Sequence, residues 1–100
     1  MTASLPIQRL EHYTERFPHE VLLVSAQMDG EADFVVVFRG FSSSLVKPTA
    51  ADPAVPVLTA AAVIETIDRL QGPYQPNNPQ YLERDIPWGV FSDRLQALGL

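Results

Sequence analysis

Two runs of apolar residues separated by a short polar turn constrain the fold of this chain more than any other feature. The first run is EVLLVSAQ, residues 20–27, and the second is FVVVFRGF, residues 34–41. The segment between them contains Asp29 and Gly30, a pair that favours the tight turn of a β-hairpin. Neighbouring positions near the centre of both runs are apolar, which is typical of strands covered on both faces. The pattern therefore predicts an antiparallel hairpin within a small sheet.

Both ends of the chain have the spacing of amphipathic helices. In residues 5–17 the apolar side chains recur at three- and four-residue steps, and Ser4 is a candidate N-cap. A second, short helix is predicted over residues 86–98, with Asp85 as its candidate cap and Gly99 after its end. We expect these two helices to pack on the sheet.

Residues 62–70 fit either a helix or a strand. A helix would place four apolar side chains on one face: Val63, Ile64, Ile67 and Leu70. The alanines that precede this segment favour a helix, whereas its β-branched residues favour a strand. The residues themselves leave both structures open.

Prolines control the remaining segments. Pro48, Pro53 and Pro56 forbid a regular helix, so this stretch is predicted to wrap around the sheet. In residues 72–81 prolines recur every third residue, which suits polyproline II. We therefore predict a single small globular domain over residues 1–100 of the α+β class. Its parts are an N-terminal helix, an antiparallel hairpin with one or two further strands in a small sheet or open barrel, a proline-rich wrapping segment and a short C-terminal helix.

The composition excludes several classes of function. The chain has no cysteine, which rules out a disulfide framework, a thiolate metal site and a cysteine nucleophile. Its formal net charge is −5 with only 7 Lys and Arg residues, so the composition disfavours nucleic acid as a partner. No secretory leader is visible, and no window approaches the ~18 apolar residues of a membrane span. We expect a cytoplasmic protein without a membrane span.

The most unusual stretch is FRGFSSSLVKP, residues 38–48, which contains three adjacent serines. The loop Gly40–Leu45 can hold an anion if its hydroxyls and N–H groups converge. A Walker loop or an esterase elbow would require further glycines, and Ser44 stands where the elbow needs its second glycine. The favoured interpretation is structural, with hydroxyls satisfying backbone groups where the strand leaves the sheet.

Two histidines raise the question of a metal site. On an unbroken helix His12, Glu15 and His19 would share one face and resemble metal ligands. Pro18 interrupts that helix, and no further cluster of ligands is visible in the sequence. We therefore expect neither a metal ion nor another cofactor.

Asp68 and Arg69 lie beside a turn and are candidate binding residues. Arg69 can pair with a ligand carboxylate or phosphate, but an ion pair that anchors the proline segment is the favoured interpretation. Asp68 has no visible partner as a general base, because Glu65 would point to the opposite face of a strand. Three aromatic side chains would form a partner-binding patch if they are exposed, and the sequence does not separate this from core burial: Phe41, Tyr74 and Trp88.

Two phrases of the sequence, GFSSSL at residues 40–45 and IDRLQGPYQP at residues 67–76, resemble those of a small protein family of cyanobacteria and plastids. That family is catalogued only as a domain of unknown function, and the resemblance covers about residues 18–95. It implies an intracellular protein, in the cytosol of a cyanobacterium or the stroma of a plastid. It also implies a strand at 62–70, but it brings no activity, substrate or catalytic residue.

These features predict a non-enzymatic accessory or protein-interaction module with a protein partner of unknown identity. The resemblance implies service to a photosynthetic or plastid-type assembly. The alternative is a domain that binds a small ligand or an anion through the Gly40–Leu45 loop. No acid–base or nucleophile–base pair stands out, so an enzyme is not expected, and the oligomeric state is left open. The candidate contact residues are Arg39, Gly40, Phe41, Ser42, Ser43, Ser44, Lys47, Asp68, Arg69 and Tyr74.

Overall fold

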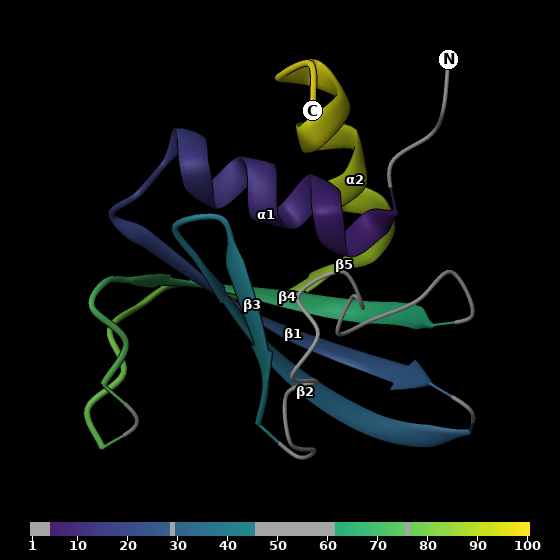
Figure 1. The fold of residues 1–100 in the computed structure, drawn as a ribbon, viewed down its shortest axis with the longest axis horizontal. Helices are drawn as coiled ribbons and strands as arrows, with labels where there is room; N and C mark the ends of the chain where they lie inside the picture. Colours follow the sequence, from purple (N-terminus) through teal and green to yellow (C-terminus); the bar gives the residue numbers. More distant parts are fainter. Residues whose placement is uncertain (1–4, 29, 46–61, 76) are drawn as a thin grey trace.

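A five-stranded antiparallel sheet with two helices on one side forms the framework of the protein (Figure 1). The computed structural model describes residues 5–28, 30–45, 62–75 and 77–100. The strands follow the spatial order β3-β2-β1-β4-β5. This arrangement confirms the predicted α+β class, with more strands than expected. The elements are α1 (Pro6–Arg16), β1 (Glu20–Met28), β2 (Glu31–Phe38), β3 (Phe41–Ser44), β4 (Val63–Gln71), β5 (Tyr81–Pro87) and α2 (Trp88–Ala97).

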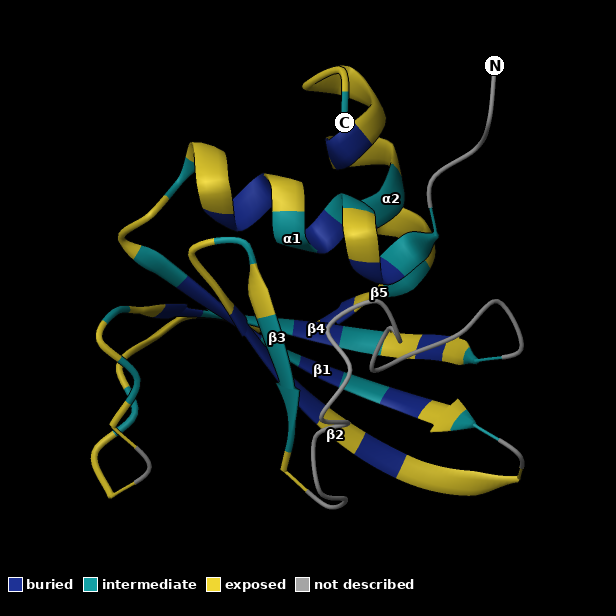
Figure 2. Cartoon of the chain, viewed as in Figure 1, coloured by how far each residue is buried: buried dark blue, intermediate teal, exposed yellow. Residues whose placement is uncertain are grey.

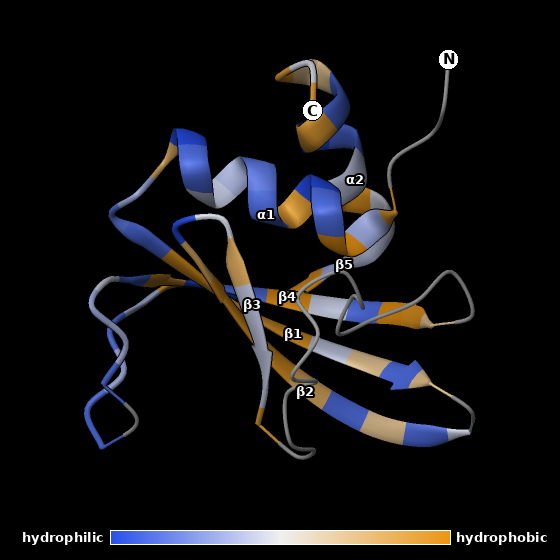
Figure 3. Ribbon diagram, viewed as in Figure 1, coloured by the Kyte–Doolittle hydropathy of each residue, from blue (hydrophilic) through white to orange (hydrophobic). Residues whose placement is uncertain are grey.

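The main hydrophobic core fills the space between the helices and the sheet. On this side, the helix face, Leu22 and Val24 of β1 lie beside Val37 and Val35 of β2. Figure 2 shows buried stretches in both helices and along the central strands, and Figure 3 shows hydrophobic residues in the middle of these strands whereas α1 is mostly hydrophilic. The helices contribute a matching set of buried side chains: Ile7, Leu10, Tyr13, Phe91 and Leu95.

A smaller cluster lies on the side of the sheet away from the helices, the opposite face. Val21, Val36 and Leu70 are buried there, and the partly buried Tyr74 packs against them. Tyr74 belongs to the connection between β4 and β5, which extends away from the helices (Figure 1). The prediction that both faces of the hairpin are covered is therefore right near this connection. It is wrong farther along β2, where Phe34 is exposed.

The predicted hairpin is present, but its second strand lies earlier in the sequence than expected, at Glu31–Phe38 instead of residues 34–41. β2 ends at Phe38 because Arg39 and Gly40 form a two-residue turn, in which Arg39 has a φ of 47° and Gly40 a φ of 83°. Phe38 pairs with Phe41, so Phe41–Ser44 runs back as β3. Positive φ at both central residues is the hallmark of a type I′ hairpin turn.

Of the two structures left open for residues 62–70, the structure has the strand that the family resemblance favours, and its bounds are Val63–Gln71. Val24 of β1 pairs with Ile67 of β4, which lies on the helix face with its side chain buried. The register between β1 and β4 shifts at Ser25 and Ala26. This shift returns Ile64 to the buried side, so the β-branched residues that favour a strand also supply the core.

The helix ends differ from the predicted caps. The N-cap of α1 is Leu5, whose backbone N–H donates to Oε1 of Gln8 at 2.9 Å, and Ser4 lies outside the described residues. α2 begins only at Trp88, since Asp85 belongs to β5 and has a φ of 54°. Gly99 does follow the end of α2 with a φ of 78°, as predicted.

The proline-rich segment predicted to wrap around the sheet, Pro48 to Pro56, lies outside the described residues, and so does Lys47. The described part of the chain contains no helix long and apolar enough to cross a membrane.

Candidate functional site

The three serines lie in β3, and their hydroxyls alternate between the two faces of the sheet. On the helix face, Ser42 Oγ donates to Oε2 of Glu11 at 2.6 Å, and Ser44 Oγ donates to Oδ1 of Asp33 at 2.8 Å. These two hydroxyls donate to carboxylates of the protein itself, and the negative charge of those carboxylates would repel a bound anion. The geometry therefore supports a structural role for Ser42 and Ser44, although these bonds go to carboxylates and not to the predicted backbone groups, and it weighs against an anion site in this loop.

The turn before β3 is fixed to α1. The backbone N–H of Gly40 donates to the hydroxyl of Thr14 at 2.9 Å, and Thr14 is completely buried. A Cβ atom at position 40 would lie 2.7 Å from Cγ of Glu15, which is closer than real contacts allow. Together with its φ of 83°, this approach explains why residue 40 is glycine. Gly40 is thus a structural residue that holds its neighbour Arg39 in place.

Arg39 has an unusual backbone conformation, and its side chain has no partner among the described residues. Its φ of 47° lies in the left-handed region, which costs a residue with a Cβ atom about 1 kcal/mol. Asn, Asp or Gly is the usual first residue of such a turn. Within the described ranges, no hydrogen bond or ion pair engages the guanidinium of Arg39. A strained residue whose charge has no structural partner is a candidate for binding.

An apolar patch, the β2–β3 patch, lies on the opposite face of the sheet. It comprises Phe34 and Phe38 of β2, Phe41 of β3 and the following Leu45. The register places all four side chains on the same face, because Phe38 pairs with Phe41 and Leu45 N–H donates to the Phe34 carbonyl at 2.7 Å. All four are exposed, Phe41 to 71%. Exposed aromatic groups of this kind are typical of surfaces that bind partners.

A pocket of about 520 Å³ adjoins this patch. Val21, Val36, Phe38 and Tyr74 supply its apolar walls. Arg39 is among the polar residues that line it.

A backbone hydrogen bond joins two segments that line the pocket, residues 18–19 and residues 72–73. The N–H of Gly72 donates to the carbonyl of His19 at 2.7 Å, and both residues line the pocket with Pro18 and Pro73. The pocket is therefore built on paired strands and on a fixed turn at its side, rather than on a single loop.

The structure brings some of the predicted contact residues together and separates others. Arg39 and Tyr74 meet at the pocket although they are distant in sequence. Asp68 lies apart from them, and its Oδ1 accepts a hydrogen bond from the backbone N–H of Asp85 at 2.7 Å. The predicted aromatic patch is not one surface, because Trp88 packs against the main core while Phe41 is exposed on the opposite face. Lys47 lies outside the described residues.

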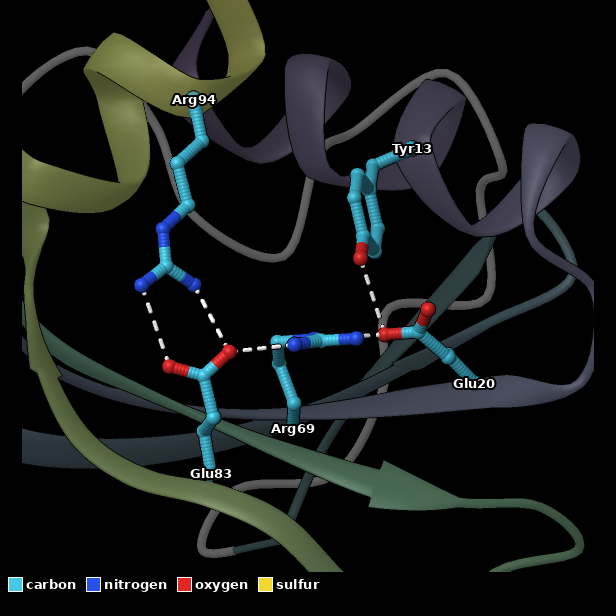
Figure 4. Close-up of polar contacts among 5 residues, drawn as sticks. All are labelled: Tyr13, Glu20, Arg69, Glu83 and Arg94. Atoms are coloured by element: carbon cyan, nitrogen blue, oxygen red, sulfur yellow. Dashed lines mark hydrogen bonds and ion pairs between the residues drawn. The ribbon is translucent and has the colours of Figure 1, made fainter.

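Arg69 belongs to a network of charged groups on the helix face (Figure 4). Its Nε donates to Oε1 of Glu20 at 2.7 Å, and its Nη1 donates to Glu83. Tyr13 OH also donates to Oε1 of Glu20, at 2.8 Å, and Arg94 binds both oxygens of Glu83, at 2.8 and 3.1 Å. This charge network links α1, β1, β4, β5 and α2, so Arg69 joins secondary-structure elements rather than anchoring the proline segment.

The electrostatics of the charge network stabilise the ordinary charge states of Tyr13, Arg69 and Glu83. Burial, followed by the hydrogen bond to Glu20, raises the pKa of Tyr13 to about 12. The hydrogen bonds from Arg94 and Arg69 lower the pKa of Glu83, and the bond to Glu20 raises the pKa of Arg69. Acid–base catalysis requires the reverse, a pKa moved toward neutrality. The charge network therefore has the properties of a structural link.

Sequence reasoning missed most of this network because its members come from five separate elements. Glu20 was assigned to a strand without a role, and neither Glu83 nor Arg94 was singled out. The positions of Glu20 and Arg69 do carry a signal: each is a charged residue two positions from a buried apolar residue of the same strand, Leu22 and Ile67 respectively. Opposite charges on the buried face of two strands predict an ion pair once those strands are known to be neighbours.

Comparison with known proteins assigns the chain to a family. The model of the family described as Domain of unknown function (DUF7734) matches residues 7–95. Because this match covers most of the chain, the protein belongs to that family. No curated protein and no solved structure matches the chain. The expected membership of a family of unknown function is confirmed, while the cyanobacterial and plastid setting stays a prediction.

Proposed function

We propose that this member of the family is a non-enzymatic interaction module that binds another protein through the β2–β3 patch. The observation that carries this proposal is the exposure of three phenylalanines on one face of two paired strands: Phe34, Phe38 and Phe41. Leaving such side chains in water is unfavourable, and a partner that covers them recovers the free energy of burial. Strand pairing holds the patch in place, so little order needs to be gained on binding.

The charge beside the patch indicates what kind of partner segment fits. Arg39 follows Phe38 directly and has no partner among the described residues. A segment with apolar side chains next to a carboxylate would complement both features. A second copy of this chain complements them less well, because each copy has a formal net charge of −5 and the two would repel one another. We therefore favour a different protein as the occupant.

The absence of catalysis is part of the proposal and rests on the charge network. Its acidic, basic and phenolic groups are engaged with one another, and the pKa shifts of Tyr13, Arg69 and Glu83 keep them in their ordinary charge states. The setting we propose is intracellular, in a photosynthetic or plastid-type assembly. Only the resemblance of the GFSSSL and IDRLQGPYQP phrases supports that setting.

The test is affinity capture with a Phe34→Ser/Phe41→Ser double variant beside the unchanged protein. Tagged proteins are incubated with lysate of the cells that make this protein, and captured proteins are quantified by mass spectrometry. The partner is then purified, and its affinity for each variant is measured directly. We expect saturable binding to the unchanged protein and at least tenfold weaker binding to the double variant, since loss of buried aromatic anchors costs well over about 1.4 kcal/mol.

Exposed apolar residues elsewhere provide a matched control. Leu82 of β5 and Val90 of α2 are 48% and 46% exposed, so the Leu82→Ser/Val90→Ser variant removes similar groups outside the patch. It should bind like the unchanged protein. A purified partner that binds both double variants equally would refute the role of the patch. Sedimentation of the protein alone tests the second-copy alternative, because a dimer that only the patch variant loses would replace the proposed partner.

A further inference from the structure

We propose that the pocket beside the β2–β3 patch binds a carboxylate attached to an apolar, preferably aromatic, group. The carboxylate would pair with Arg39, and the apolar group would lie between Phe38 and Tyr74. This inference goes beyond the proposed partner binding and does not depend on it, since a small molecule is enough to occupy the pocket. The two sites share Phe38 at their boundary.

The apolar part of the site is a stable surface. Val21 and Val36 belong to adjacent strands and are 4% and 7% exposed, so strand pairing fixes the walls they provide. Tyr74 packs against these residues from the β4–β5 connection. Aromatic rings at Phe38 and Tyr74 favour a flat apolar group, which can contact their faces. A volume of about 520 Å³ falls within the range of small-molecule sites in proteins.

The polar part of the site is also prepared for a ligand. In the turn that carries Arg39, the N–H of Gly40 donates to the hydroxyl of Thr14, and Gly40 lies close to the side chain of Glu15. The backbone of the turn is therefore fixed before a ligand binds. In the described residues, neither the guanidinium of Arg39 nor the hydroxyl of Tyr74 has a protein partner. A guanidinium can donate two parallel hydrogen bonds to a carboxylate. The phenol and the imidazole of His19 add further donors at the same pocket.

The chemistry of the lining selects this class of ligand. A sugar would leave many hydroxyls without partners against Val21, Val36 and Phe38. A hydrocarbon without charge would leave the guanidinium of Arg39 unused. A single carboxylate on an apolar body matches both parts of the lining. Such a group can be a free organic acid or the last residue of a polypeptide, whose C-terminal carboxylate stands beside its side chain.

The test is a titration of the protein with hydrocinnamate, followed by its amide NMR signals, with neutral hydrocinnamide as the matched probe. We expect saturable shifts at His19, Val21, Val36, Arg39 and Tyr74. The amide should bind about tenfold more weakly, because it cannot form a charge-assisted pair with Arg39. No saturable shift at millimolar hydrocinnamate, or shifts confined to other surfaces, would overturn the proposal.

The Arg39→Asn variant isolates the guanidinium without threatening the fold. Asn-Gly is a favoured pair for a type I′ turn, so this variant should melt at the same temperature as the unchanged protein or higher. Its affinity for hydrocinnamate should fall about tenfold, to the level of the amide. The control is Arg84→Asn, which removes an exposed arginine stacked on Tyr81 and should leave the affinity unchanged. Equal loss in both variants, or no loss in Arg39→Asn, would contradict the inference.

A second arm identifies the source of the carboxylate. The peptide acetyl-Gly-Ala-Phe is titrated with a free C-terminus and as its C-terminal amide. Tighter binding of the free peptide than of hydrocinnamate, with loss in the amide, would assign the pocket to a polypeptide C-terminus. Tighter binding of hydrocinnamate would assign it to a free organic acid. Equal binding of the free peptide and its amide, together with equal binding of hydrocinnamate and hydrocinnamide, would refute a carboxylate site.

Discussion

The two faces of the sheet are built from the same strands but are completed differently. On the helix face, aliphatic side chains are buried under α1 and α2, and the charge network satisfies the polar groups beside them. On the opposite face, the buried residues that the structure describes form a small cluster against which Tyr74 packs, and three phenylalanines of β2 and β3 are exposed. The same alternation of side chains thus supplies a core on one side and a candidate binding surface on the other.

This difference indicates where stability and binding reside. Groups on the helix face have their partners within the chain: Ser42 has Glu11, and Arg69 has Glu20. Arg39 has no such partner among the described residues, and it lies at the pocket on the opposite face. We therefore expect substitutions on the helix face to lower the free energy of unfolding, and substitutions on the opposite face to affect mainly binding.

Neighbouring leucines of β1 give the largest expected contrast. Leu22 is fully buried on the helix face, whereas Leu23 is partly buried on the opposite face. Leu22→Ala should lower the free energy of unfolding by about 3 kcal/mol, since it leaves a cavity in the main core. Leu23→Ala should cost about 1 kcal/mol. Urea denaturation of both variants measures the contrast, and equal losses would show that the two faces contribute alike.

The charge network is the next test. Arg69→Met leaves the carboxylates of Glu20 and Glu83 without their shared cation, and Glu20 is only 15% exposed. We expect a loss of about 2 kcal/mol, below the range for fully buried pairs because Arg69 retains some contact with water. Arg84→Met, at an exposed arginine over Tyr81, should change stability by less than about 0.5 kcal/mol. Urea denaturation in which the two variants match would mean that the network is not a structural link.

The smallest effect is expected at Tyr13 and depends on pH. Tyr13→Phe removes the hydrogen bond to Glu20 and should cost about 1 kcal/mol at neutral pH. Because folding raises the pKa of Tyr13 to about 12, its contribution is complete below the ordinary phenol pKa of about 10 and is lost as the pH rises through the folded value.

The stability difference between the unchanged protein and Tyr13→Phe should therefore shrink between about pH 10 and 12. Chemical denaturation across this range measures it, with the exposed Tyr81→Phe as the control for removing a phenol. A difference that stays constant up to pH 12 would contradict the assigned coupling between Tyr13 and Glu20.

Local signals predicted the parts of the fold that depend on neighbouring residues. Apolar runs flanking Gly30 indicated the first hairpin, and helical spacing indicated α1. The second turn was missed because Arg39 is not a usual residue for a type I′ turn. β5 was missed because YLERDIP, its sequence, does not alternate clearly between apolar and polar residues. Its place is set by pairing with β4, which is a tertiary interaction.

The candidate site shows the same limit. Arg39 and Tyr74 were singled out from sequence, and the fold brings them to one pocket. Phe34 and Phe38 were not singled out, because they belong to an apolar run that predicts burial on both faces. Their exposure depends on how far the β4–β5 connection covers the sheet, and the strand's own residues carry no information about that.

The irregular edge of the sheet at β5 has a consequence for how copies of the chain behave when they are crowded. The register between β4 and β5 shifts twice, and Asp85 turns its backbone N–H toward the carboxylate of Asp68. An incoming strand therefore finds an interrupted row of donors and acceptors along β5. Sheets grow into fibrils most readily from straight, regular edges. We therefore expect the distortion that ends β5 and leads into α2 to protect this edge of the protein against aggregation as well.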